Sequence, residues 1–250
     1  MKDSLYNYTL RLGDTSLILA QRLSEWTGHG PFLEEDLALT NIALDIFGRA
    51  KGLLEYAAKK EGKGRTEDDL AFFRSDREFF NLLITEQPNG DYAKTMIRQS
   101  IIDCFDLLFY TELAKSKDLT LAGIASKSVK EITYHKRHSF SWVVRFGNGT
   151  EESFSRLQKG LNEIWAYSGE LFEMNEDDHN LIKEGIAVDL DSLKQKWELE
   201  IKDLFEKANL VIPETLFMQQ GSRKALHSEY LGYILAEMQS IPRMHPNAKW

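Results

Sequence analysis

The chain has 250 residues, of which 42% are hydrophobic and 28% charged; its formal net charge is −8 and its pI is near 5.4. This acidic balance, without a dense Lys/Arg cluster, argues against nucleic acid as a partner, and no apolar run approaches the ~20 residues that a membrane-spanning helix needs. The single cysteine, Cys104, excludes a disulfide framework and an all-cysteine metal site. Because the first residues carry no signal-peptide pattern, we expect a cytoplasmic protein.

Apolar residues recur at helical spacing along most of the chain. The pattern predicts helices over 4–27, 33–61, 66–86, 92–116, 118–146, 151–174, 190–208 and 224–240. Glycine and proline mark the breaks, as in Gly28-His29-Gly30-Pro31 after the first helix and Gln87-Pro88-Asn89-Gly90 before the fourth. Two short β-like runs, at 187–190 and 210–213, lie between helical patterns, and we expect them to be extended connectors.

The connections between the long predicted helices are short, which favours antiparallel packing of neighbouring helices. We therefore predict an all-α protein, an up-and-down helical bundle with additional C-terminal helices. Residues 1–250 are expected to form a single domain, with the bundle core at about 4–174 and a C-terminal helical elaboration at about 175–250.

Polar groups stand in the middle of the apolar faces of three predicted helices. In the range 117–146 one helical stripe consists of Leu121, Ile124, Ser128, Glu131, His135, His138 and Trp142. Asp103 and Asp106 occupy the corresponding part of the fourth helix, and Asp45 and Arg49 that of the second. Spacings of three or four residues place such groups on one face, and a buried acid is costly unless it is paired or bound to a metal.

A carboxylate-bridged di-iron or di-manganese site is the first chemistry to test against this pattern. It needs a Glu from each of two helices and a Glu-x-x-His pair from each of two others. The literal match, Glu176-Asp177-Asp178-His179, lies in a polar run outside the long apolar-faced helices. We interpret this run as a solvated acidic loop or the start of a helix.

The long helices carry altered versions of the same motif. On the fifth helix Glu131 is followed by Tyr134 at i+3 and by His135 at i+4, and on the second helix Gly48 stands three residues after Asp45. This pattern indicates a metal site whose ligands have been replaced. It assigns no catalytic residue, cofactor-binding residue or metal ligand to the chain.

The favoured interpretation is a satisfied polar network at the former metal position. Its members, the predicted polar cluster, are Asp45, Asp103, Glu131 and His135. A protonated histidine, or Arg49, can neutralise buried acids without any metal. A mononuclear metal site made by Glu131, His135 and His138 is the alternative, although this spacing is frequent in helices by chance. Cys104 lies in an apolar stretch that raises a thiol pKa, so we do not expect a nucleophile there.

Several segments, taken in order, carry a likeness to one known family. They are 11–31, 35–45, Glu86-Gln87-Pro88-Asn89-Gly90, 130–135, Arg145-Phe146-Gly147-Asn148-Gly149-Thr150, 184–188 and 235–239. Together they resemble the structural (C) subunits of bacterial ring-1,2-phenylacetyl-CoA epoxidase, which act in phenylacetic acid degradation. The resemblance extends over essentially the full chain, to Trp250.

The resemblance implies a ferritin-like fold that has lost its di-iron ligands, and therefore a non-catalytic subunit without a cofactor of its own. It also implies partners: a homologous di-iron catalytic oxygenase subunit, which binds the CoA thioester, and other components of the NADPH-dependent monooxygenase complex, including a reductase. Two other functions stay open. One is an autonomous ferritin-like oxidase that uses Glu131, His135 and Asp103; the other is a helical adaptor unrelated to aromatic catabolism.

Overall fold

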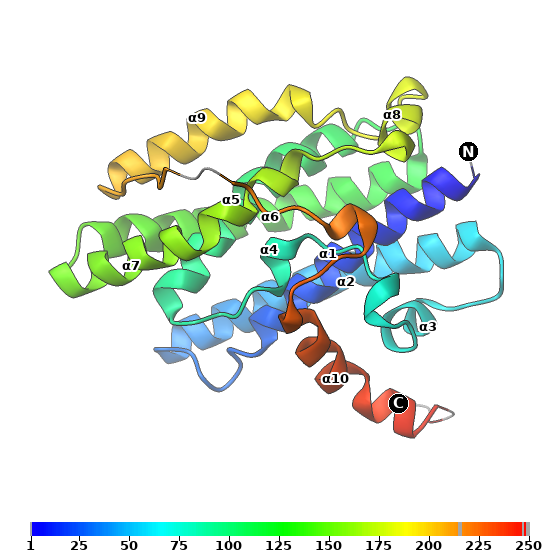
Figure 1. The fold of residues 1–250 in the computed structure, drawn as a ribbon, viewed down its shortest axis with the longest axis horizontal. Coiled ribbons are helices and arrows are strands. Elements are labelled where there is room, and N and C mark those ends of the chain that lie inside the picture. Colours follow the sequence, from blue (N-terminus) through cyan, green and yellow to red (C-terminus); the bar gives the residue numbers. More distant parts are fainter. Residues whose placement is uncertain (1, 215–216, 247, 249–250) are drawn as a thin grey trace. The chain divides into compact units, whose positions relative to one another are not determined.

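The computed structural model describes residues 2–214, 217–246 and 248, so Met1 and Trp250, the ends of the predicted domain, lie outside the described residues. Within these residues the chain consists of helices and irregular connections, without a strand (Figure 1). The predicted all-α, ferritin-like class is confirmed. The chain divides into two compact units, Met1–Pro88 with Gly221–Trp250 and Asn89–Gln220. The single domain stays a prediction.

Each unit is built around one pair of long helices. The first unit contains α1 (Lys2–Ser24), α2 (Leu33–Glu61), α3 (Glu67–Phe72), η1 (Asp76–Glu78), α4 (Leu83–Glu86), η4 (Ser222–Lys224) and α10 (Glu229–Met244). The second contains α5 (Tyr92–Leu113), α6 (Leu119–Gly147), α7 (Glu151–Ile164), η2 (Trp165–Tyr167), η3 (Gly169–Phe172), α8 (Glu176–Lys183) and α9 (Asp191–Lys207).

In the first unit, α1 and α2 form an antiparallel hairpin (Figure 1). Gly13 allows the two helices to approach closely, since a Cβ there would lie 2.7 Å from Cδ2 of Leu54. The core of the unit joins this hairpin to α3 and to α10. Its buried side chains include Leu10, Leu17, Ile18, Leu54, Leu70, Phe79, Leu231, Ile234 and Leu235. The C-terminal helix thus completes the core that the N-terminal hairpin begins.

The predicted helix over 66–86 is wrong, because the segment is three short helices separated by irregular turns. Two capping boxes explain the break. The Thr66 hydroxyl accepts from the backbone N–H of Asp69, whose side chain accepts from the Thr66 N–H. The Glu78 side chain accepts in the same way from the Ser75 N–H at 2.8 Å. A second helix-start signal nine residues after the first interrupts the helical pattern, and buried Arg74 stands between them.

The predicted helix over 151–174 is also too long: α7 ends at Ile164 and two 3-10 turns follow. The acidic run after it begins a helix, α8, with Asn175 as its N-cap. Connectors without regular structure occupy 187–190 and 210–213, as predicted.

In the second unit α5 is buried on nearly every side, with α6, α7 and α9 around it. The indole N–H of Trp197 on α9 donates to the carbonyl of Ile101 on α5 at 3.2 Å. Gly147, the last residue of α6, lies against the backbone of Ala208, and a Cβ there would come within 2.1 Å of the Ala208 oxygen. Glycine is therefore required where α6 meets the end of α9.

Candidate functional site

The predicted polar cluster is distributed over three helices. Asp45 lies on α2 in the first unit, whereas Asp103 on α5 and both Glu131 and His135 on α6 belong to the second. Asp103 and His135 are buried, at 3% and 2% exposure. Asp45 and Glu131 are only partly buried. Buried Arg49 donates from Nε to the Ser16 hydroxyl at 3.1 Å. That the four members of the cluster form one network stays a prediction.

The contacts that Asp103 and Glu131 make differ in kind. Ser139, one turn after His135 on α6, donates its hydroxyl to Oδ2 of Asp103 at 2.7 Å. Glu131 instead lies 3.5 Å from the ammonium group of Lys127, one turn earlier on the same helix. Ser139 was missed as a partner of Asp103, although its spacing of four from His135 places both on the same helical face.

Cys104 lies beside a cross-helix ion pair in the second unit. Lys136 on α6 pairs with Glu200 on α9, and the thiol lies 3.7 Å from Oε2 of the same carboxylate. Burial raises the pKa of Cys104 to about 12, and the nearby Lys136 charge only partly opposes this. The expectation of a raised thiol pKa is confirmed, and the neutral thiol is a poor nucleophile.

Among the residues that the structure describes, no three His, Cys, Asp or Glu side chains are grouped so that they could hold a metal ion. The literal Glu-x-x-His motif lies in the first two turns of α8, where Glu176 and His179 are exposed. This position agrees with the interpretation of the run as a helix start. His138 is partly exposed, and its ring stacks on that of Tyr134 at a centroid distance of 6.3 Å.

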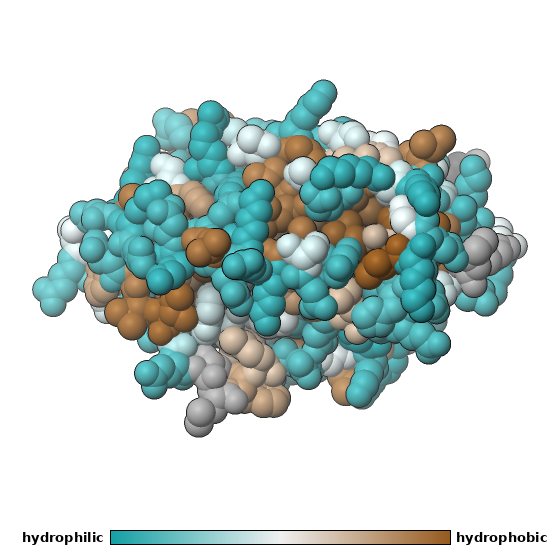
Figure 2. Space-filling model, turned by 90° about the horizontal axis from the view of Figure 1, so that it is seen from above, coloured by the Kyte–Doolittle hydropathy of each residue, from teal (hydrophilic) through white to brown (hydrophobic). Residues whose placement is uncertain are grey.

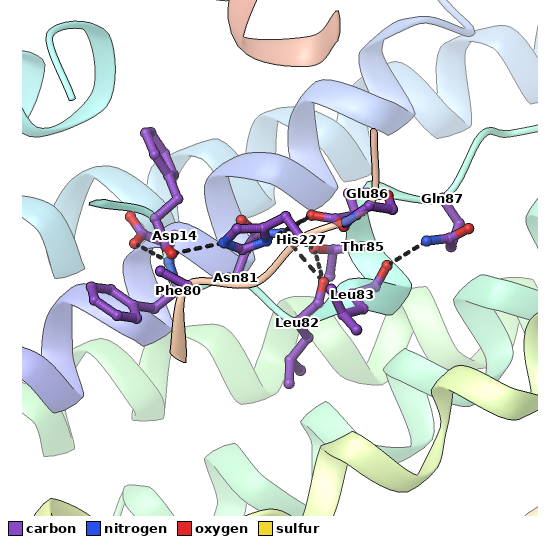
Figure 3. Close-up of polar contacts among 12 residues, drawn as sticks. Asp14, Phe80, Asn81, Leu82, Leu83, Thr85, Glu86, Gln87 and His227 are labelled. Carbon is purple, nitrogen blue, oxygen red and sulfur yellow. Dashed lines mark hydrogen bonds and ion pairs between the residues drawn. The ribbon is translucent and has the colours of Figure 1, made fainter. Parts of the chain in front are cut away.

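The first unit holds a buried polar network that the helical patterns did not indicate (Figure 3). Asp14 on α1 and Arg74 form an ion pair at 0% and 2% side-chain exposure. Oδ2 of Asp14 also accepts from the backbone N–H of Phe80 at 3.0 Å. The Arg74 guanidinium lies 4.1 Å from the ring centroid of Phe79 and donates to the carbonyl of Glu78 at 2.7 Å. These contacts hold the irregular segment between α3 and α4 against α1.

A second carboxylate, that of Glu86, lies a few residues further on in the same network (Figure 3). Its Oε2 accepts from the side-chain amide of Asn81 at 3.0 Å, and its Oε1 accepts from the backbone N–H of Ser228 at 2.6 Å. Oε2 is also 3.0 Å from Nδ1 of His227. Arg22 on α1 donates from Nε and Nη2 to the Glu86 backbone carbonyl at 3.1 and 2.8 Å. Glu86 therefore ties α1, α4 and the segment before α10 together.

Exposed apolar side chains form a stripe at the start of α2, the α2 stripe. Its members are Phe32, Leu33, Leu37 and Leu44, which are 54–72% exposed. The three leucines lie at i, i+4 and i+11, on one face of the helix. Further along α2, a cavity of about 320 Å³ is lined by α1, α2 and α3, among them Phe47, Lys51 and Phe72. Large exposed apolar patches are typical of surfaces that bind another macromolecule.

Apolar side chains also gather in patches on the face seen in Figure 2, among a majority of hydrophilic ones. None of the described helices combines the length and the hydropathy needed to cross a membrane.

Comparison with known proteins gives two findings. The family model described as "Phenylacetic acid catabolic protein" matches residues 1–250. The chain is also 47% identical, over 248 residues, to the C subunit of the 1,2-phenylacetyl-CoA epoxidase of Escherichia coli (strain K12). That alignment covers 99% of this chain and 100% of the relative. The chain belongs to the phenylacetic acid catabolic protein family.

Proposed function

We propose that this chain is the non-catalytic structural subunit of a multicomponent phenylacetyl-CoA 1,2-epoxidase, and that it supports a homologous di-iron catalytic subunit in aerobic phenylacetate catabolism. The observation that carries the proposal is the 47% identity with the C subunit of such an epoxidase over the whole of both chains. Identity of this extent, over 99% of this chain and 100% of the relative, supports the same place in a complex. In this proposal the partner, and not this chain, would hold the di-iron centre that supplies the oxygen chemistry, with electrons from a reductase.

The surroundings of the predicted polar cluster support the absence of a metal centre in this chain. Asp103 accepts a hydrogen bond from Ser139, and Glu131 is paired with Lys127. A di-iron carboxylate of a helical bundle also needs Glu-x-x-His pairs among its ligands, and neither α5 nor α6 carries such a pair. In this proposal Asp45, Asp103, Glu131 and His135 are remnants of metal positions that now belong to the protein's internal packing.

The α2 stripe supports assembly with a helical partner. A single exposed leucine is ordinary, but here three share one face of a helix and Phe32 stands immediately before them. Docking of the homologous catalytic subunit on this stripe removes the apolar groups from water. An obligate interface of this kind buries roughly 2,000 Å² or more.

Co-expression with a di-iron homologue from the same genome tests the proposal. We expect one defined complex on size exclusion, iron in the partner, and less than one iron per copy of this chain when it is purified alone. Elution of the two chains as separate species at micromolar concentration contradicts the pairing. One or two tightly held metal ions in the isolated chain contradict the structural role and favour the oxidase alternative.

The stripe is tested by charge substitution. Leu37→Glu and Leu44→Glu, made together, place two carboxylates on the proposed interface and should abolish the complex while the isolated chain keeps its helical circular dichroism. Leu199→Glu is the matched control, because Leu199 is 62% exposed on α9, outside the stripe. Full complex formation by the double variant shows that the partner binds elsewhere.

A further inference from the structure

The buried imidazole of His227 has a hydrogen-bond acceptor at each of its two nitrogens. Nε2 lies 2.8 Å from the backbone carbonyl oxygen of Phe79, and Nδ1 lies 3.0 Å from Oε2 of Glu86. The two side chains are 6% and 0% exposed. A carbonyl oxygen only accepts, so Nε2 must carry a hydrogen. A neutral imidazole has one N–H, so the contact at Nδ1 requires a second proton.

The donors around Glu86 indicate where this proton lies. Oε2 already accepts from Asn81 Nδ2, and Oε1 already accepts from the N–H of Ser228. The amide of Asn81 is held in this orientation because Nδ2 also donates to the carbonyl of Leu82 at 3.3 Å. Donors on both oxygens stabilise the ionised carboxylate. We propose that His227 and Glu86 bind one proton as an imidazolium–carboxylate pair, and that this proton-binding site fastens the start of α10.

Charged residues surround the pair on several elements. Those near it in the chain, or bonded to its neighbours, are Asp14, Arg22, Glu25, Arg74, Arg77, Arg223, Lys224 and Glu229. Two of the arginines have carboxylates of their own: Arg22 pairs with Glu25 at 2.6 Å, and Arg74 pairs with Asp14. Arg77 is exposed and donates to the carbonyl of Ala225 at 3.4 Å. The negative charge of Glu86 thus has His227 as its direct ionic partner in the described network.

The position of the pair gives it a mechanical role. Glu86 is the last residue of α4, and His227 with Ser228 leads directly into α10. The next residues of α10 place Leu231 in the core of the first unit at 0% exposure. Further along, Gln239 donates to the carbonyls of Ala71 and Arg74, both at 3.0 Å. The Gln239 side chain does not titrate. When the His227–Glu86 pair loses its proton, the start of α10 should therefore detach before the part of the helix that Gln239 holds.

The direction of the pH effect follows from proton binding. A free imidazole has a pKa of about 6.5 and is protonated below that pH in the unfolded chain as well. Above about pH 6.5 the unfolded chain releases the proton while the folded pair keeps it. The unfolding equilibrium constant should then rise up to about tenfold per pH unit, until the folded pair also loses its proton.

Glu86→Gln tests the pair without removing its shape. The amide donates to an unprotonated Nδ1 and its oxygen still accepts from Ser228, so no extra proton is needed. Asn81 loses its acceptor at Oε2, which lowers stability equally at every pH and leaves the slope unaffected. We expect urea unfolding between pH 6.5 and 8.5 to lose the steep pH dependence in this variant, whatever its stability at a single pH. Glu25→Gln, which leaves the pair intact, is the control and should keep the wild-type slope. An unchanged slope in Glu86→Gln overturns the proposal.

A spectroscopic measurement on the unmodified full chain makes the test independent of how well the variant folds. With ¹⁵N-labelled histidine at pH 7.5, both ring nitrogens of His227 should carry directly bonded hydrogens, assigned by the loss of these signals in His227→Gln. A ring with a single N–H at Nε2 contradicts the imidazolium.

Discussion

Two buried acids of the first unit, Asp14 and Glu86, are satisfied differently from Asp103 of the second. In the first unit, Asp14 and Glu86 are fully buried and are met by cations and backbone N–H groups from irregular segments. In the second unit, Asp103 is met by a hydroxyl from the neighbouring long helix. Arg74, the partner of Asp14, lies 60 residues away in the chain, and His227, the partner of Glu86, lies 141 residues away. The partner of Asp103, Ser139, instead lies on a helical stripe that is visible in the sequence. Buried charge at Asp14 and Glu86 holds irregular chain in place, whereas at Asp103 it fits between two regular helices.

The largest expected effect comes from breaking the ion pair of the first unit. Arg74→Ala leaves Asp14 buried without its cation, and removing one partner of a buried pair costs about 3–5 kcal/mol. Urea unfolding of the purified chain measures the loss. Arg156→Ala is the matched control, because its pair with Glu152 is exposed at 58% and 72%, and such pairs contribute about 0–1 kcal/mol. Equal losses in the two variants contradict the contrast between buried and exposed pairs.

A smaller loss of stability is expected when Asp103 loses the hydroxyl that donates to it. Ser139→Ala removes the hydroxyl that donates to Asp103 and should reduce the free energy of unfolding by about 1–3 kcal/mol. Ser126→Ala is the control, because that exposed hydroxyl bonds only to a carbonyl of its own helix. If Ser139→Ala loses less free energy of unfolding than Ser126→Ala does, Asp103 has another donor or is hydrated.

Glu131 should contribute little to stability, because its side chain is 22% exposed and its lysine partner is 71% exposed. Glu131→Gln is expected to change the free energy of unfolding by less than about 1 kcal/mol. Under the proposed function, the assembled complex should also keep its turnover. A stable, assembled but inactive variant favours the oxidase alternative, in which Glu131 is a ligand.

The smallest effect is expected at Cys104. Its pKa is raised to about 12, so the thiolate is scarce at neutral pH, and a thiol reagent at pH 8 should leave the folded chain unlabelled. One equivalent of the reagent should react with Cys104 when the chain is unfolded in urea. Rapid labelling of the folded chain contradicts this prediction and shows that the part of α5 around Cys104 opens readily to solvent.

Local patterns predicted the long helices well, and α2 has the predicted bounds of 33–61. The segment 66–86 was mispredicted because its breaks are set by capping boxes and by Arg74 reaching Asp14, 60 residues away. Asp103 and His135 could be placed on buried faces from helical spacing. The pairing of Glu86 with His227 joins segments 141 residues apart and leaves no periodic signal in either.

The discontinuous first unit has a consequence for synthesis. Its N-terminal hairpin leaves the ribosome before the 132 residues of the second unit, 89 to 220, and long before α10. At about 5–20 residues per second, this delay lasts roughly 7–26 s. During that time Leu17 and Ile18 lack the leucines of α10 that later cover them. A nascent chain of this protein therefore exposes apolar surface until α10 has been made, and chaperones have that interval in which to bind the hairpin of α1 and α2.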